Sequence, residues 1–180
     1  MSNEIAIPLR RKLRIETIGE GTSGTIETSE DERRAIAKLL DLVALDHLVF
    51  EYHLTPSSRG RIRMNGRLAA GVVQTCVVSL DPVPSALDVP VEMEFWPEGA
   101  VVALEKTSEK DPGASLLDWP EPIEDGTIEL GKVLYETLAT SLDPYPKKAG
   151  ASFEWSEGPG GKAEAGGSGP FAALERLKRR

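Results

Sequence analysis

The stretch that decides the fold is Ile62–Pro82, IRMNGRLAAGVVQTCVVSLDP, the longest run with strand character in the sequence. Its odd positions begin with arginine and asparagine, whereas its even positions are mostly apolar, which is the period-two pattern of a strand with one buried face. The apolar even positions are Ile62, Met64, Leu68, Ala70, Val72, Cys76, Val78 and Leu80. The pattern keeps its phase across Asn65-Gly66. We therefore predict one long strand with a bulge or bend at Gly66 or Gly71, rather than a type I′ hairpin turn at Asn65-Gly66.

The segments on either side of this run have the pattern of partner strands. Residues 45–54 and 87–95 alternate apolar and polar side chains, and turn signals at 56–60 and 81–84 separate them from the central run. Residues 9–18 alternate well enough to predict a fourth strand, and residues 101–104 a short fifth one. Short connections between successive strands indicate an antiparallel sheet.

Two helices accompany these strands. Ser29-Glu30-Asp31-Glu32 has the S-x-x-E form of a capping box and is followed by an apolar stripe, which predicts a helix of about three turns. A second stripe predicts a helix over residues 128–141, which Pro144 and Pro146 cannot continue. The fold class is therefore α+β: a curved, mostly antiparallel sheet or partly open barrel, with two main helices packed on it.

Residues 1–148 are expected to form a single domain of this kind. Within it, residues 105–127 are rich in acids and prolines and predict a mobile loop. Glycine-rich residues 149–169 predict a flexible tether. Residues 170–180 predict a short C-terminal helix that starts at Pro170-Phe171 and docks either on its own domain or on a partner.

Composition narrows the functional classes. The 180 residues include 29 acids and 21 bases, a formal net charge of -8, which argues against generic nucleic-acid binding. No apolar run approaches the roughly 20 residues of a membrane helix, and MSNEIAIPLRRK lacks the apolar core of a secretory signal. A single cysteine fits a reducing compartment. We expect a cytoplasmic protein without a membrane partner.

Few residues are suited to catalysis or metal binding. Gly19, Gly21 and Gly24 spell G-x-G-x-x-G, but no helix opens at that turn, so a flexible strand connection is favoured over a dinucleotide site. His47 and His53 share a strand face at roughly 20 Å separation. Cys76 falls on the apolar face, where a buried, inert thiol is usual. We expect no enzyme, no cofactor and no metal. The alternative is a metal-binding or thiol-dependent enzyme that uses Cys76 with His47 or His53.

Basic side chains gather in two places that are candidate binding surfaces. The first, here called the arginine comb, lies in a segment without an acid from Thr55 to Leu80, and it consists of Arg59, Arg61, Arg63 and Arg67. The second, the N-terminal basic cluster, consists of Arg10, Arg11, Lys12 and Arg14. Guanidinium groups at strand spacing suit phosphates or acidic side chains. The alternative is a solvated face that is paired with the protein's own acids.

Several of these segments together resemble the YceD family of large ribosomal RNA subunit accumulation proteins. The similarity runs in order over roughly residues 8–178. Its residues include Gln74, Cys76, Leu80 and Pro82 in QTCVVSLDP, the linker PEPIEDG at 120–126, and IELG at 128–131. Further residues are Glu136 in ETLA, Pro144 and Pro146 in LDPYP, and Pro170 and Phe171 in PFAAL.

The resemblance implies a cytoplasmic factor without an enzymatic reaction that supports accumulation of large-subunit ribosomal RNA. Its partner would be ribosomal RNA or a basic ribosomal protein. Many relatives carry C-x-x-C in the central strand, with further Cys or His after the second helix, which suggests a metal. This chain departs from that pattern, because Ser79 stands at the second position and Lys147-Lys148 follows Pro146. A zinc site needs about four ligands, so metal binding is not expected here.

Overall fold

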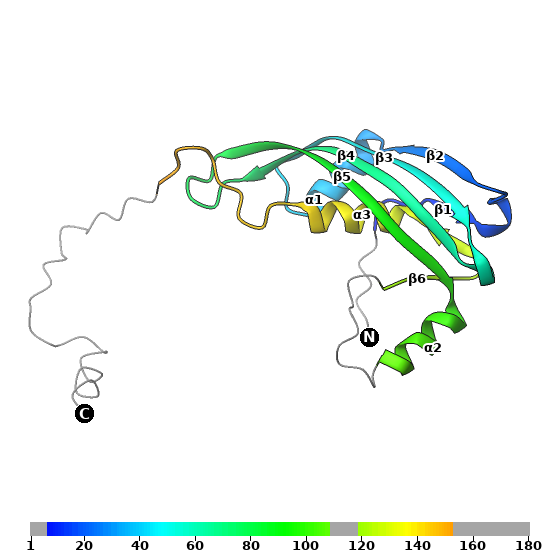
Figure 1. The fold of residues 1–180 in the computed structure, drawn as a ribbon. Coiled ribbons are helices and arrows are strands. Elements are labelled where there is room, and N and C mark those ends of the chain that lie inside the picture. Colours follow the sequence, from blue (N-terminus) through cyan, green and yellow to red (C-terminus); the bar gives the residue numbers. More distant parts are fainter. Residues whose placement is uncertain (1–6, 109–118, 153–180) are drawn as a thin grey trace, which may run out of the picture.

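A curved five-stranded sheet forms the body of the protein in the computed structural model, which describes residues 7–108 and 119–152 (Figure 1). Its strands lie in the order β2-β3-β4-β5-β6. Their bounds are Thr22–Glu27 for β2, Ala44–Pro56 for β3, Ile62–Thr75 for β4, Pro82–Pro97 for β5 and Glu121–Ile123 for β6. The first four strands pair antiparallel with their neighbours, and β6 adds to β5 in parallel. The described part of the sheet is open and does not close into a barrel.

The helices and a small second sheet lie against this body. β1 (Lys12–Arg14) pairs antiparallel with β7 (Thr127–Glu129). α1 (Glu30–Leu39) and α3 (Leu130–Ser141) lie on the concave side of the large sheet, whereas α2 (Glu98–Ser108) follows the end of β5 (Figure 1). Short 3₁₀ turns, η1 (Ile15–Thr17) and η2 (Ser58–Gly60), connect strands. The α+β class and the mostly antiparallel sheet are confirmed, but three α-helices, not two, occur in the described residues.

The capping box predicted for α1 is confirmed. The Ser29 hydroxyl accepts a hydrogen bond from the Glu32 backbone N–H at 3.3 Å, and the Glu32 carboxylate accepts one from the Ser29 N–H at 2.9 Å. These bonds satisfy two donors that would otherwise be unpaired at the helix start.

The central strand is continuous, as predicted, and the irregularity predicted at Gly66 or Gly71 lies opposite Gly71, in the partner strand β3 rather than in β4. β4 keeps its register with β5 over its whole length, and the register shift lies instead in β3, between Leu45 and His47. The two glycines of β4 have a different role. A Cβ on Gly66 would lie 2.8 Å from the Glu51 carbonyl oxygen, and one on Gly71 would lie 2.8 Å from the His47 ring. Both glycines therefore admit the groups of the adjacent strand β3.

Three further predictions from the sequence need correction. Residues 9–18 form only a three-residue strand followed by η1, and residues 101–104 belong to helix α2 rather than to a strand. Residues 105–127 are not one loop, because α2 runs to Ser108 and β6 occupies residues 121–123. Period-two and helical patterns are hard to distinguish over a few apolar residues, which explains the error at 101–104.

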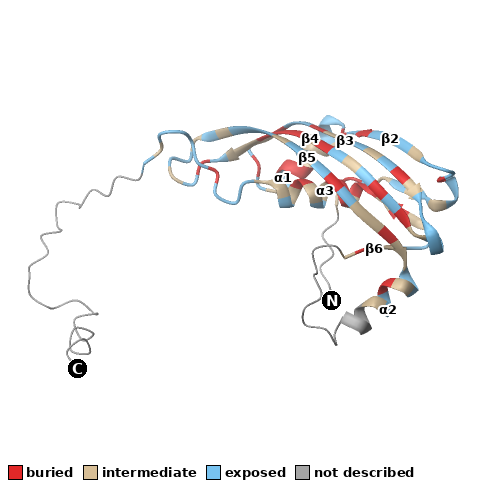
Figure 2. Cartoon of the chain, in the orientation of Figure 1, coloured by how far each residue is buried: buried red, intermediate tan, exposed pale blue. Residues whose placement is uncertain are grey.

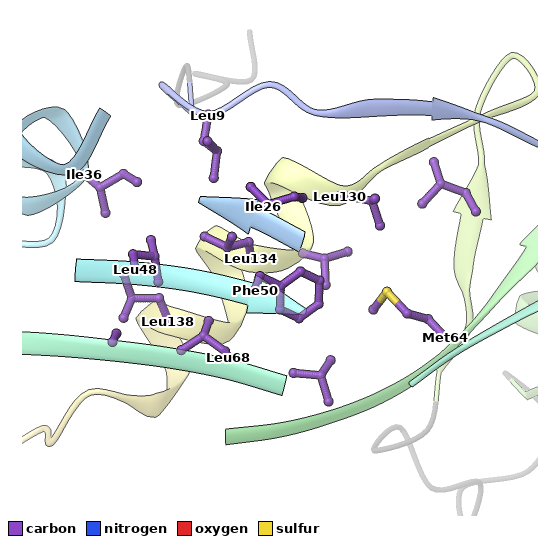
Figure 3. Packing of buried hydrophobic residues seen from close by; sticks show 14 of the residues in the cluster. Leu9, Ile26, Ile36, Leu48, Phe50, Met64, Leu68, Leu130, Leu134 and Leu138 are labelled. Atoms are coloured by element: carbon purple, nitrogen blue, oxygen red, sulfur yellow. The ribbon is translucent and has the colours of Figure 1, made fainter. Parts of the chain in front are cut away.

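The core lies between the concave side of the sheet and helices α1 and α3. Alternate residues of β3 and β4 are buried and exposed, as the stripes in Figure 2 show. Figure 3 shows the packing of residues from the strands, the two helices and the segment before β1: Leu9, Ile26, Ile36, Leu48, Phe50, Met64, Leu68, Leu130, Leu134 and Leu138. All ten are buried. The apolar even face of β4 predicted from the sequence is therefore confirmed for residues 62–72.

No helix among the described residues is long and apolar enough to cross a membrane. The predicted glycine-rich tether and C-terminal helix, with Pro170 and Phe171, lie outside the described residues, apart from the first four positions of the tether.

Candidate functional site: the outer face of the sheet and the hairpin tip

The convex side of the large sheet, here called the outer face, collects charged side chains from four strands. Residues that are directly opposite on antiparallel strands present their side chains to the same face. The register therefore places Glu27 of β2, Glu51 of β3 and Arg67 of β4 on the outer face, together with residues of β5. Its ionisable residues in the regular part of the ladder are Glu27, His47, Glu51, His53, Arg63, Arg67, Asp88, Glu92 and Glu94. Five carboxylates thus share this face with two guanidinium groups.

Both of these arginines form ion pairs with acids of β5. Arg63 donates to Glu94 Oε1 from Nε at 3.3 Å and from Nη2 at 3.0 Å. Arg67 forms a two-pronged pair with Asp88, with Nε 2.6 Å from Oδ1. The Arg67 guanidinium lowers the pKa of Asp88. Hydrogen bonds from Trp96 and Arg63 lower the pKa of Glu94.

The other two arginines of the comb, Arg59 and Arg61, lie just before the first residue of β4. Arg61 precedes the strand, and its guanidinium carbon lies 3.5 Å from the centre of the Trp96 ring, in a cation–π contact. Arg59 lies in η2 with a φ of 64°. The structure therefore does not gather the comb into one surface of uncompensated positive charge. Arg63 and Arg67 are instead paired with the protein's own acids, which is the alternative interpretation of the sequence.

The N-terminal basic cluster lies on the concave side, so the sheet separates it from the comb. Arg11 pairs with Glu32 of α1 at 2.8 Å, and its backbone N–H donates to Glu129 Oε1 at 2.6 Å. Arg10 and Lys12 line a cleft of about 380 Å³. This cleft also contains Glu121, Glu124, Glu129 and Lys132, over apolar surface from Phe95 and Val133. Arg14 ends β1 and is exposed. The charges of this cleft are mixed.

The second notable place is the end of the β4–β5 hairpin, here called the hairpin tip: the turn Cys76–Asp81 and the loop Asp143–Lys148 beside it. Although nearly 70 positions apart in sequence, the two segments are joined by several bonds. Gln74 Nε2 donates to the Asp143 carbonyl at 2.9 Å, and the Val77 N–H donates to the Pro146 carbonyl at 2.9 Å. Lys148 Nζ lies 2.9 Å from Asp81 Oδ2.

Cys76 lies at the centre of the hairpin tip and is fully inaccessible to solvent. Its sulfur accepts hydrogen bonds from the backbone N–H groups of Val78 and Ser79, both at 3.4 Å, and of Lys148 at 3.3 Å. The Lys148 N–H, then the Ser79 hydroxyl and backbone N–H, favour the thiolate and lower the pKa of Cys76 to about 6, against the opposing effect of burial. Cys76 is buried, as predicted, but its partners are amides rather than the apolar core.

The predicted burial of Leu80 is wrong. The strand ends at Thr75, so the period-two pattern no longer applies, and Leu80 is 76% exposed with a φ of 61°. Val77 and Tyr145 are exposed beside it, at 54% and 76%. The sequence signals for this place were the Asp81-Pro82 and Pro144-Tyr145-Pro146 turns. They indicate loops, but they cannot show that two loops meet.

The histidines do not join Cys76. His47 and His53 lie on the outer face, where His53 Nδ1 is 2.8 Å from Ser23 Oγ, whereas the Cys76 sulfur is enclosed in the hairpin tip. No group of three His, Cys, Asp or Glu side chains in residues 7–108 and 119–152 is arranged to hold a metal ion. The arrangement gives no support to a site built from Cys76 and a histidine.

The remaining residues of the family resemblance have structural positions. Pro82 begins β5, Pro144 is exposed in the hairpin tip and Pro146 is buried there. Glu136 lies on the exposed side of α3, with Oε1 3.9 Å from Lys132 Nζ, and partial desolvation of its carboxylate raises its pKa.

A comparison with models of protein families shows to which family the chain belongs. The model of the YceD family, described as "Large ribosomal RNA subunit accumulation protein YceD", matches residues 64–178. The chain belongs to the YceD family. The matched range includes most of β4, β5, α3 and the whole hairpin tip, but not β2, α1 or β3. No curated protein and no solved structure matches the chain.

The turn after Cys76 in this YceD protein is held by hydrogen bonds to one sulfur. The backbone N–H groups of Val78 and Ser79 turn toward the Cys76 sulfur, and the Lys148 N–H donates to it from the other loop. Hydrogen bonds to one sulfur thus join two loops without a further sulfur ligand.

Proposed function

We propose that this protein supports accumulation of large-subunit ribosomal RNA in the cytoplasm as a non-enzymatic factor, and that it binds a basic ribosomal protein through the outer face of its sheet. The family description supports the role in ribosomal RNA accumulation. The observation that carries the choice of partner is the charge of the outer face, where five carboxylates stand against Arg63 and Arg67, with Arg61 beside them over Trp96.

The pairing of the arginines argues against direct RNA contact by this face. A phosphate that approached Arg63 or Arg67 would have to displace Glu94 or Asp88, and the displaced carboxylate would remain beside it. Nucleic-acid affinity comes from phosphates that neutralise free Lys and Arg. Glu51 and Glu92 add further negative charge near the same arginines. A surface of this kind attracts a cationic partner and repels phosphate.

Co-purification from cells tests the proposal. A tagged chain is expected to retain a basic ribosomal protein after nuclease treatment, and Glu51→Lys with Glu92→Lys is expected to abolish this retention. Glu98→Lys is the matched control, since Glu98 is exposed at the start of α2, off the outer face. The arginine comb as an RNA surface makes the opposite prediction: ribosomal RNA would be retained and would be lost on reversal of Arg61 and Arg63. That result would overturn the proposal.

A further inference from the structure

The two long edges of the large sheet differ in how they are protected. Exposed edge strands invite pairing with another chain, and proteins guard them with proline, charge or a covering element. Before it meets β6, β5 carries Pro82, Pro84 and Pro90, and α3 packs near it. The opposite edge is β2, TSGTIE, which has no proline or lysine and has one charged residue, Glu27. β2 is the unguarded edge.

The register identifies the backbone groups that β2 leaves available. The backbone N–H of Thr28 donates to the carbonyl of Leu48 in β3. In an antiparallel pair, every second residue points its N–H and C=O groups to the same neighbour, so Ile26, Gly24 and Thr22 also point these groups toward β3. The N–H and C=O groups of Ser23, Thr25 and Glu27 therefore point away from β3. Within the described residues, these N–H and C=O groups form no hydrogen bond with the backbone of another segment. This is the donor and acceptor spacing that an added strand requires.

The surroundings of this edge carry negative charge. From Ile15 to Glu32 the chain has six acids and no lysine or arginine. Glu30 and Asp31 pair with Arg34, and Glu32 pairs with Arg11. The other three acids, Glu16, Glu20 and Glu27, are exposed and have no ion pair in the described part of the chain. A second copy of the chain would bring the same acids against them, so self-pairing is opposed, whereas a cationic strand is attracted.

We propose that β2 accepts an extended, lysine- or arginine-rich peptide segment as an additional strand, through the backbone of Ser23, Thr25 and Glu27. This inference rests on the proposed function and narrows its partner to a protein with such an extended basic segment. Backbone hydrogen bonds would supply the affinity. The acids that flank the strand would select for positive charge.

Thr25→Pro tests strand addition in the whole chain. Because the Thr25 N–H points away from β3, proline removes no bond of the native ladder, and an unchanged Tm verifies that the variant folds. The probe is a fluorescent eight-residue peptide of alternating lysine and valine. We expect Thr25→Pro to weaken its binding at least 10-fold, and Glu27→Lys to weaken it several-fold, whereas Glu98→Lys leaves it unchanged. A peptide with the same residues but N-methylated at every second amide is expected to bind at least 10-fold more weakly.

Equal binding of the methylated and unmodified peptides, or unchanged binding by a folded Thr25→Pro variant, would overturn strand addition. A dimer of the native chain that Thr25→Pro dissociates would also overturn it, by making a second copy the occupant. These failures are separate from failure of the proposed function. If Thr25→Pro still retained the ribosomal protein while reversal of Glu51 and Glu92 released it, the outer face would bind the partner without an added strand.

Discussion

Gly131→Ala is expected to destabilise the protein, although alanine is normally favoured over glycine in a helix. Gly131 is the second residue of α3, and the segment before β1 crosses directly over it. A Cβ at this position would press into the Leu9 carbonyl oxygen and would lie 2.9 Å from the Leu9 carbonyl carbon and 3.1 Å from the Arg11 nitrogen. These are backbone atoms, so no side-chain rotation can relieve the contact. The crossing segment must move.

The cost follows from what holds that segment. Two bonds are affected: the Leu130 N–H donates to the Arg11 carbonyl at 2.9 Å, and the Arg11 N–H donates to Glu129 at 2.6 Å. Loss of both costs about 2 kcal/mol. Partial exposure of Leu9, now 1% exposed, adds about 1–2 kcal/mol. The helix propensity of alanine returns about 1 kcal/mol. The net loss is about 2–3 kcal/mol, a fall in Tm of roughly 4–12 °C for a chain of this size.

Gly99→Ala provides the matched control. Gly99 is also the second residue of its helix, α2, but a Cβ there would meet nothing within 4 Å. We expect its Tm to be unchanged or slightly higher. Thermal unfolding followed by circular dichroism measures both variants. If Gly131→Ala unfolded within about 1 °C of Gly99→Ala, the close backbone crossing would be refuted, and with it the way the N-terminal basic cluster is anchored.

Two further predictions concern the hairpin tip. The pKa of Cys76 is about 6 in the folded chain and about 8.5 for a free thiol, so the folded state binds fewer protons and stability rises with pH between these values. The Tm advantage over Cys76→Ser, whose hydroxyl does not ionise, should therefore grow from pH 6 to pH 9, and a constant difference would contradict a buried thiolate. Leu80→Gly removes a positive φ at an exposed position and should stabilise the chain by about 0.5–1 kcal/mol, measured by urea unfolding. A loss of stability would show that the Leu80 side chain packs.

The sequence predicts the central strands β3 and β4 well, because the period-two pattern of apolar residues coincides there with the buried face of the sheet. Met64, Leu68 and Phe50 follow a period-two pattern on paired strands, and Ser29 with Glu32 forms a purely local capping motif. The pattern fails where the chain stops being a strand. Leu80 keeps the even-numbered phase of β4, but the turn that begins at Cys76 ends the alternation, and nothing apolar covers the side chain.

The sequence predicts which basic residues belong to the candidate site, but it does not predict which acids pair with them. The arginines of the comb are visible in the sequence, but their partners Asp88 and Glu94 lie 21 and 31 positions away on β5. Only the strand register decides that these acids share a face with Arg63 and Arg67. A local segment without acids therefore gave a misleading impression of a positive surface. Charge on a sheet is a property of the assembled face, and composition along one strand does not determine it.

The enclosed sulfur of Cys76 has a further consequence for the hairpin tip. A buried polar atom without partners would destabilise the fold, but this sulfur receives amides from both loops, so the same bonds that satisfy it hold the loops together. An apolar residue of similar size would leave the N–H groups of Val78, Ser79 and Lys148 without this acceptor. Serine would retain an acceptor, but its hydroxyl oxygen lies closer to Cβ than the sulfur does and carries no negative charge. All three hydrogen bonds would therefore be weaker. The Cys76 sulfur therefore stabilises the hairpin tip as a shared hydrogen-bond acceptor for both loops.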